Sequence, residues 1–245
     1  MKAMVFAAGL GTRLRPLTDT VPKALVKVGG VPMLQHVILN LKRNGFDDIV
    51  VNVHHFAGKV KNFLRENDDF GVKITVSDES DCLLDTGGGI VKAAQYLEGD
   101  QPFLIHNVDI LTDLDLNAMY KECISSGADA TLLTALRDTS RYLLLDAEGL
   151  MKGWINVTTG QVKPPGLEAS LYDHFAFGGI HVMSQSALKA LCEYSDGNPF
   201  SVTTFYIDKC REIAIKGYVD NSGYSWFDIG RHATLEAAEK WLTGK

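Results

Sequence analysis

The sequence predicts an α/β fold in which a largely parallel sheet is covered by helices on both faces. Two observations lead to this prediction. Short apolar segments alternate with amphipathic segments through the first half of the chain, and glycine-rich stretches follow two of the apolar segments. Sheets of this kind bind ligands in the crevice at the carboxyl ends of their strands. We therefore expect the functional residues to follow directly after strands.

The first half holds the clearest alternation of strands and helices. Residues 3–8 form an unbroken apolar run, which is typical of a buried strand. Apolar residues recur at helical spacing over 34–41, and Gly45 suits the C-terminal end of that helix. The further expected elements of this half are strands at 48–53, 72–76 and 102–106 and helices at 60–64 and 87–97.

The second half is less regular, and we interpret part of it as an insertion. The expected elements are strands at 130–136, 142–145, 174–183 and 224–228, a hairpin with loops at 150–171, and helices at 184–192, 202–213 and 234–242. The chain shows no internal repeat, low-complexity tract or linker. These features predict a single domain over 1–245, with two halves at about 1–115 and about 116–245.

Composition excludes several classes of protein. The chain has 245 residues, 24 Lys plus Arg and 30 Asp plus Glu, and therefore a net charge of −6. Hydrophobic residues make up 46% and charged residues 22%, as in ordinary globular domains. An acidic surface argues against a nucleic-acid partner, because phosphate backbones need a basic face. A small anionic substrate remains possible, since a few local cations and amide groups suffice for it.

The sequence also predicts no membrane partner and a cytoplasmic location. No apolar run approaches the roughly 20 residues that span a bilayer. The N-terminal apolar run leads straight into a glycine-rich loop, as a first strand does and a signal peptide does not. The four cysteines are scattered without a C-x-x-C pair, which favours free thiols in a reducing compartment.

The strongest functional signal is the stretch Ala7-Ala8-Gly9-Leu10-Gly11-Thr12-Arg13, followed by Pro22-Lys23. Two glycines after a strand allow close approach to a phosphate or base. The third glycine of a dinucleotide fingerprint is replaced by Leu14, and no Walker A loop occurs. Nearby cations could neutralise a triphosphate. The composition fits equally well with solvated cations beside a structural turn.

This stretch resembles the signature of the sugar-1-phosphate nucleotidylyltransferases. The resemblance implies a Rossmann-like three-layer sandwich with a mostly parallel, mixed central sheet. It further implies that residues 1–115 bind the nucleotide and 116–245 the sugar. By resemblance, Lys23 would contact phosphate, Arg13 would hold the leaving pyrophosphate, and the nucleotide would be lined by Ala8, Gly9, Gly11, Thr12 and Arg13.

A second signal is the stretch Asp85-Thr86-Gly87-Gly88-Gly89. Each glycine costs about 1 kcal/mol against alanine inside a helix, which suggests close approach of a ligand to helix N-terminal amide groups. The alternative is a flexible cap. In the resembled family a similar stretch contacts the base, so Gly88 is the expected base contact. Glu79, in the loop before it, is an expected base or ribose contact.

A third signal is Asn107-Val108-Asp109 at the end of a strand, together with Trp226-Phe227-Asp228-Ile229-Gly230. Carboxylates are good ligands for Mg²⁺, although single aspartates more often cap turns or helices. Both stretches resemble the metal-binding pair of the family, which implies that Asp109 and Asp228 hold Mg²⁺ and that Asn107 contacts the nucleotide. The family has glycine where this chain has Val108, which could narrow the site.

Sugar contacts are less clearly marked. The stretch 177–182 resembles the family's strand beside the sugar, which implies contacts from Phe177 and Gly179. Trp154 and Asn156 lie in the insertion and are further candidates. The Glu-Lys-Pro that many family members carry here is absent. Other polar residues are expected to be structural: Asp113 and Asp115 as helix caps, and His54, His55, His106 and His174 as strand-end residues.

The resemblance implies transfer of a nucleotidyl group from an NTP to a sugar 1-phosphate. The Thr-Gly-Gly-Gly-Ile stretch, the short length and the Trp-x-Asp-x-Gly favour UTP with N-acetylmuramic acid 1-phosphate, as in peptidoglycan recycling. GTP with mannose 1-phosphate and dTTP with glucose 1-phosphate are alternatives. A nucleotide-sugar-binding regulatory protein without turnover is the alternative of another class. The oligomeric state, monomer or dimer, stays open.

Overall fold

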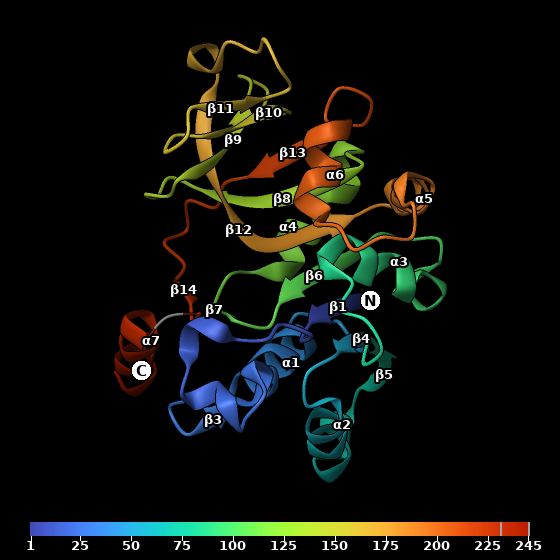
Figure 1. The fold of residues 1–245 in the computed structure, drawn as a ribbon, viewed down its shortest axis with the longest axis vertical. Helices are drawn as coiled ribbons and strands as arrows, with labels where there is room; N and C mark the ends of the chain where they lie inside the picture. The colour runs from blue at the N-terminus through green and yellow to red at the C-terminus, as the bar shows by residue number, and fades with distance from the viewer. Residues whose placement is uncertain (231, 245) are drawn as a thin grey trace.

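The computed structural model describes residues 1–230 and 232–244, in which the main feature is a mixed ten-stranded sheet (Figure 1). Its strands are β1 (Lys2–Phe6), β4 (Asp48–Val53), β5 (Lys73–Asp78), β6 (Phe103–Asn107), β8 (Ala130–Ala135), β9 (Arg141–Leu145), β10 (Met151–Asn156), β11 (Gln161–Lys163), β12 (Asp173–Met183) and β13 (Ile215–Tyr218). The order is β11-β10-β9-β12-β6-β1-β4-β5, and β8 pairs with both β12 and β13.

Parallel pairing prevails in the first half of the chain and antiparallel pairing in the second, where β13 is nevertheless parallel to β8. β1 is parallel to β4 and β6, and β4 is parallel to β5. β12 is antiparallel to β6, β8 and β9, and the hairpin strands β9, β10 and β11 are antiparallel as well. The predicted α/β fold with a mixed central sheet in one domain is confirmed, with its parallel pairs concentrated in the first half.

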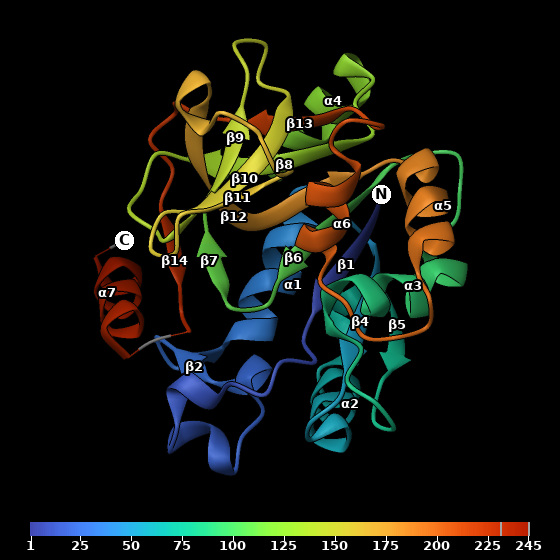
Figure 2. The same ribbon diagram turned by 45° about the horizontal axis from the view of Figure 1, so that its top comes forward.

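Helices cover both faces of the sheet, and the side chains of β1 point alternately into the two cores between the sheet and these helices. Ala3 and Val5 belong to one core and Met4 and Phe6 to the other. The helices of the first core are α1 (Met33–Arg43), α2 (Ala57–Glu66) and α4 (Leu116–Ser126), and those of the second are α3 (Asp85–Leu97), α5 (Gln185–Tyr194) and α6 (Val202–Lys209). Figure 2 shows the two groups on opposite sides of the sheet.

Two small sheets extend this architecture. β7 (Ile110–Thr112) pairs with β14 (Trp226–Asp228), and β2 (Lys27–Val28) pairs with β3 (Val31–Pro32). The C-terminal helix α7 (His232–Thr243) packs on β14 and β2 over a third, smaller core. The pairing of β14 with β7 brings residues 226–229 beside the segment that follows β6.

Sequence reasoning misses β7, β13 and the β2–β3 pair, and it places the end of α6 too late. α6 ends at Lys209, and the Ala214 carbonyl oxygen then accepts from the Asp129 amide while the Ala214 amide donates to Asp129 Oδ2, directly before β13 pairs with β8. Asp115 caps α4 as expected, whereas Asp113 accepts a hydrogen bond from the Ser225 amide. Among the helices in the described ranges, none has the length and apolar character needed to cross a bilayer.

Candidate active site

A cavity of about 440 Å³ lies at the carboxyl ends of β1, β4 and β6. Six of the predicted site residues line it together: Ala8, Gly9, Lys23, Glu79, Asn107 and Asp109. A larger groove of about 660 Å³ between α1 and α7 is lined by none of the predicted site residues. The smaller cavity is therefore the candidate active site, and it lies where open α/β sheets bind ligands.

An ion pair lies in the wall of this cavity. The ammonium group of Lys23 donates a hydrogen bond to Asp109 Oδ2, and each side chain is 14% exposed. Lys23 begins a short 3₁₀ turn after Pro22, and Asp109 follows β6. Because both charges are largely shielded from water, the pair holds a cation and a carboxylate at one place in the cavity wall.

Two hydrogen bonds to the Gly11 carbonyl oxygen fix the conformation of the glycine-rich loop. Gly11 has φ +66°, and its carbonyl oxygen accepts hydrogen bonds from Thr18 Oγ1 at 2.8 Å and from the Leu14 amide at 2.9 Å. A Cβ on Gly11 would lie 2.8 Å from Thr18 Cγ2. This position requires glycine for its backbone conformation and for the close approach of Thr18.

Thr12 and Arg13 follow in an exposed 3₁₀ turn and lie outside the lining of the cavity. The guanidinium of Arg13 lies beside Gly230 instead. A Cβ built on Gly230 would be 3.1 Å from Arg13 Nη2 and 2.8 Å from Asp228 Oδ1. Arg13 and Asp228 thus approach the same glycine at the rim of the site.

Asp109, which directly precedes β7, lies beside the end of β14 that holds Asp228. Asp228 pairs in register with Ile110, and the Ile229 amide donates to the Asp109 carbonyl oxygen at 2.8 Å. In the described part of the chain, no group of three or more His, Cys, Asp or Glu side chains forms a metal cluster. Two carboxylates fit Mg²⁺, which commonly keeps several waters and takes further ligands from substrate phosphates.

The start of α3 differs from the sequence prediction. The amide groups of Gly87 and Gly88 donate to the Phe200 carbonyl oxygen at 2.8 and 3.3 Å. A Cβ on Gly87 would lie 2.3 Å from the Phe200 ring. These two amide groups are therefore bonded to Phe200, and Gly88 lies outside the cavity lining, so its contact with the base stays a prediction. Asp85 and Thr86 line the cavity here instead.

Glu79 lines the cavity but is fully buried. Burial raises the pKa of Glu79, and hydrogen bonds from the Asn52 side chain and the Leu84 amide act against this shift. Asn52 is a cavity residue that sequence reasoning misses. The available signal is a polar residue near the end of an otherwise apolar β-branched strand.

The side chain of Val108 packs into the first core. The family resemblance leads us to expect glycine at position 108. The Val108 side chain is buried among core residues that include Ala7 and Ile180, and its amide donates to the Phe6 carbonyl oxygen. The extra bulk is therefore accommodated largely by the core, although the residue still lines the cavity.

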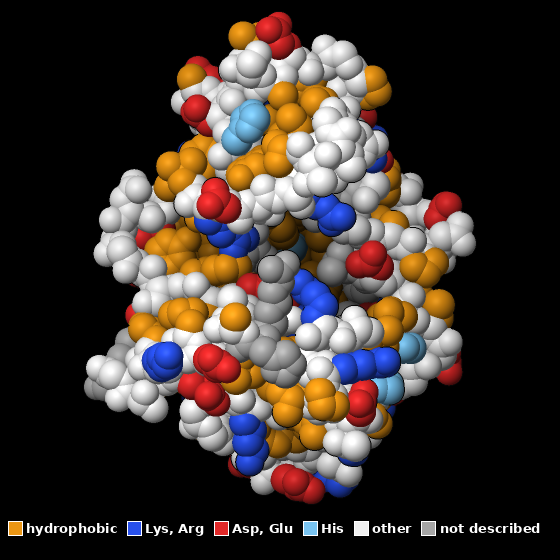
Figure 3. All heavy atoms as spheres, turned by 60° about the vertical axis from the view of Figure 1, so that its left-hand side comes forward, with side chains coloured by type: hydrophobic (Ala, Val, Ile, Leu, Met, Phe, Trp, Pro, Cys, Tyr) orange, Lys and Arg blue, Asp and Glu red, His pale blue; other side chains and the backbone are white. Residues whose placement is uncertain are grey.

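A second cavity of about 370 Å³ lies over the hairpin strands. Its lining includes Phe177 and Trp154 and three cations that sequence reasoning misses, Arg137, Arg141 and Lys163. The register of the antiparallel strands places Leu143, Trp154 and Lys163 side by side. Figure 3 shows a face that is hollowed near its middle, with Lys and Arg side chains on the walls of the hollow.

The other two predicted sugar contacts lie outside this second cavity. Asn156 caps its own turn, since its Oδ1 accepts from the Thr158 amide at 3.0 Å, and it lines neither cavity. Gly179 has φ +75°, and a Cβ there would lie 2.9 Å from Asn107 Nδ2. Gly179 therefore faces a residue of the first cavity.

Trp226 connects β12, at Gly178, with the segment after β8, at Arg137. Its indole Nε1 donates to the Gly178 carbonyl oxygen at 2.9 Å, and the Arg137 guanidinium lies 3.7 Å from the centre of its ring. Arg137 also donates to the Phe177 carbonyl oxygen. Burial lowers the pKa of Arg137, and the negative charge of Asp228 opposes this shift.

The names of curated relatives of this chain describe enzymes that act on sugar phosphates. It is 43% identical over 125 residues to an N-acetylmuramate alpha-1-phosphate uridylyltransferase from Neisseria meningitidis, a match that covers 51% of this chain and 54% of that protein. It is 30% identical over 242 residues to a UTP–glucose-1-phosphate uridylyltransferase from Synechocystis, covering 94% of this chain and 60% of that protein. The chain thus spans about half of the length of the relatives it matches.

Solved structures show the same fold. A crystal structure of HddC from Yersinia pseudotuberculosis complexed with GMP-PN has a TM-score of 0.76 at 22% identity, covering 98% of this chain and 99% of that one. A UDP-glucose pyrophosphorylase complexed with UDP-glucose has a TM-score of 0.76 at 17% identity, covering 100% and 99%. The family described as "Nucleotidyl transferase" matches residues 2–244. The chain therefore belongs to the nucleotidyl transferase family.

Proposed function

We propose that the protein transfers a nucleotidyl group from an NTP to a sugar 1-phosphate, giving an NDP-sugar and pyrophosphate. The observation that carries this proposal is the Lys23–Asp109 ion pair in a cavity that begins at the glycine-rich loop. The cavity offers a cation for phosphate, a carboxylate beside it, and a wall that includes the glycine-rich loop at Ala8 and Gly9. The nucleotide would lie on the half formed by 1–115 and the sugar on the half formed by 116–245.

The reaction forms one P–O bond and breaks another. An oxygen of the sugar phosphate attacks the α-phosphorus, and pyrophosphate leaves with the electron pair. Since the attacking oxygen is already anionic, no side chain has to remove a proton. The protein contributes positioning and charge neutralisation. Lys23 would hold phosphate charge, and Arg13, at the rim, would bind the leaving pyrophosphate.

Asp109 and Asp228 would hold Mg²⁺ in this proposal. Their backbone positions are adjacent at the end of the β7–β14 pair, and a two-carboxylate set fits an ion that takes its other ligands from phosphate and water. When bound, Mg²⁺ would neutralise the charge that develops on the phosphates. Asp228 is held by the Gly230 amide, which donates to its Oδ1 at 2.8 Å.

We propose UTP and N-acetylmuramic acid 1-phosphate as the substrates, in cytoplasmic peptidoglycan recycling. The name of the Neisseria relative supports this choice. The second cavity supports it independently, because its lining includes three cations and, among the described residues, no Asp or Glu. N-acetylmuramic acid carries a carboxylate that glucose and mannose lack, and such cations would suit it.

A pyrophosphate-release matrix tests this function. UTP, dTTP, GTP, CTP and ATP are each combined with the 1-phosphates of N-acetylmuramic acid, N-acetylglucosamine, glucose and mannose, with Mg²⁺ present. We expect the highest kcat/KM for UTP with N-acetylmuramic acid 1-phosphate. A signal for GTP with mannose 1-phosphate would replace the uridylyl assignment. Nucleotide binding without any pyrophosphate release would indicate a regulatory protein.

Two variants test the sugar assignment within this matrix. Arg141→Met and Lys163→Met remove charge from the second cavity, and each should raise KM for N-acetylmuramic acid 1-phosphate about tenfold, the scale of a charge-assisted hydrogen bond. Any activity with N-acetylglucosamine 1-phosphate should change little. Lys189→Met, on the exposed surface of α5, is the matched control. Equal effects on both sugars would remove the support for an acidic sugar.

A further inference from the structure

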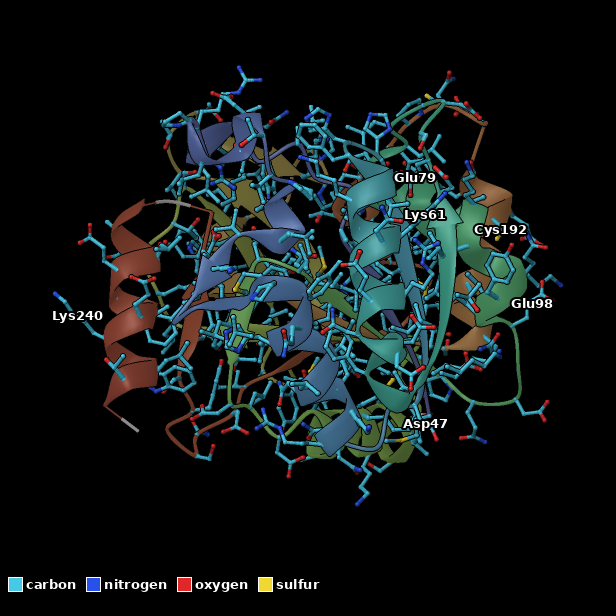
Figure 4. The ribbon with its side chains drawn as sticks, turned by 90° about the horizontal axis from the view of Figure 1, so that it is seen from below. Asp47, Lys61, Glu79, Glu98, Cys192 and Lys240 are labelled. Carbon is cyan, nitrogen blue, oxygen red and sulfur yellow. The ribbon has the colours of Figure 1, made fainter. Side chains whose placement is uncertain are left out.

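A buried polar pair lies behind the first cavity and connects three segments of the chain. Asn52 Oδ1 accepts a hydrogen bond from the Ala7 amide at 2.7 Å, and Asn52 Nδ2 donates to Glu79 Oε1 at 2.7 Å. Glu79 Oε2 accepts from the Leu84 amide at 3.3 Å. Asn52 is 2% exposed and Glu79 is fully buried. Figure 4 shows Glu79 near α3, on the side of the molecule opposite Lys240 of α7.

The fold makes room for this pair at a glycine. A Cβ on Gly89 would lie 2.9 Å from Glu79 Oε1 and 3.0 Å from Asn52 Nδ2. The third glycine of the α3 stretch therefore accommodates the polar pair. A buried amide left without an acceptor destabilises the fold, and this pair supplies acceptors for the Ala7 and Leu84 amides.

Both ends of this chain of hydrogen bonds lead into the cavity wall. Ala7 directly precedes Ala8 and Gly9, and Leu84 directly precedes Asp85 and Thr86. We propose that Asn52 and Glu79 are positioning residues that hold the glycine-rich loop and the loop before α3 at a fixed separation for the nucleotide. That the ligand is a nucleotide rests on the proposed function.

Exchanging the two functional groups tests this role. In Asn52→Asp two carboxylate oxygens would face each other, and in Glu79→Gln one hydrogen bond of the chain loses its acceptor. The double variant N52D/E79Q keeps all three hydrogen bonds. Its carboxylate at position 52 accepts from the Ala7 amide and from the side-chain amide at position 79, whose oxygen accepts from the Leu84 amide. The swap also keeps the net charge and nearly the same volume.

We expect each single variant to weaken UTP binding about tenfold and the double variant to recover to within about threefold of wild type, because 1.4 kcal/mol corresponds to a tenfold change. Binding is measured by calorimetry, so the result does not depend on turnover. Hydrogen exchange of the two loops should be faster in each single variant and restored in the double variant. Thr134→Val removes a buried hydrogen bond to Tyr218 elsewhere and is the control for general destabilisation.

Two results would overturn the proposal. If the double variant binds UTP as poorly as Glu79→Gln, the Glu79 carboxylate contacts the nucleotide directly. If Thr134→Val loosens the same two loops, the effect reports overall stability. Absence of UTP binding in the wild type would count against the proposed function alone, because the hydrogen-exchange pattern across the four variants still decides whether the pair holds the loops.

Discussion

The ammonium group of Lys23 donates a hydrogen bond to the carboxylate of Asp109, and this contact joins the segment after the glycine-rich loop to the end of β6. The free protein thus already holds in place the cation that we propose contacts phosphate. Electrostatic groups that are fixed in advance lower a barrier most effectively, because they need no reorganisation during the reaction.

Lys23→Ala and Asp109→Asn should each reduce kcat by about 10²-fold or more, the scale for removal of one fixed electrostatic group. The measurement is pyrophosphate release under saturating substrates. Lys27→Ala, an exposed lysine nearby in sequence, should retain full turnover. Turnover near the wild-type value in either site variant would contradict the roles assigned to these residues.

Gly179→Ala should reduce activity and stability together. At φ +75° the new Cβ is strained by about 1–2 kcal/mol and would also lie 2.9 Å from Asn107 Nδ2, so Asn107 must shift. Gly160→Ala separates the two effects, since Gly160 has φ +71° with no atom within 4 Å of its Cβ position. Both should lower the melting temperature, but only Gly179→Ala should lower kcat/KM.

His181→Phe should make the protein less sensitive to acid. Burial lowers the pKa of His181 to about 3, and neither ring nitrogen has a hydrogen-bond partner among the described residues. The unfolded chain binds this proton near pH 6.5 and the folded chain only near pH 3, so the free energy of unfolding falls as the pH drops between these values.

The expected loss from this histidine is about 2 kcal/mol between pH 7 and pH 5, because only the unfolded state takes up the proton there. Urea unfolding at the two pH values measures it, and the loss should be smaller in His181→Phe. Burial lowers the pKa of His106 in the same way, to about 4, so some acid sensitivity should remain.

Trp226→Phe should affect the sugar phosphate more than the nucleotide. The variant keeps a ring beneath Arg137 but loses the hydrogen bond to the Gly178 carbonyl oxygen, worth about 1 kcal/mol. We expect KM for the sugar phosphate to rise about fivefold and KM for the NTP to stay constant in steady-state kinetics. An equal rise in both would show that Trp226 supports the whole site.

The first half of the fold was predictable because its elements are marked locally. The run at 3–8 is apolar over its whole length, and the helix at 34–41 has a clear period, so β1 and α1 were expected close to their observed bounds. β7 and β13 have three and four residues, and pairing with β14 and β8 defines them. Their own sequences carry too little pattern to identify them.

The candidate site divides in the same way. Lys23 and Asp109 lie in continuous motifs, which sequence reasoning can find. Three cations come together in the second cavity through strand register and the position of the end of β8: Arg137, Arg141 and Lys163. Their spacing in the sequence does not predict this cluster. The contact of the α3 glycines Gly87 and Gly88 with Phe200 could not be predicted, because Phe200 lies in a distant segment of the chain.

The pairing of β14 with β7 has a consequence for the order in which a ribosome makes the site. Lys23 and Asp109 are synthesised well before Asp228, which reaches Asp109 only through this short pair. A nascent or prematurely terminated chain that stops before Asp228 can complete the large sheet, whose last strand is β13, yet still lacks the second carboxylate. Completion of the proposed metal pair therefore follows completion of the main sheet.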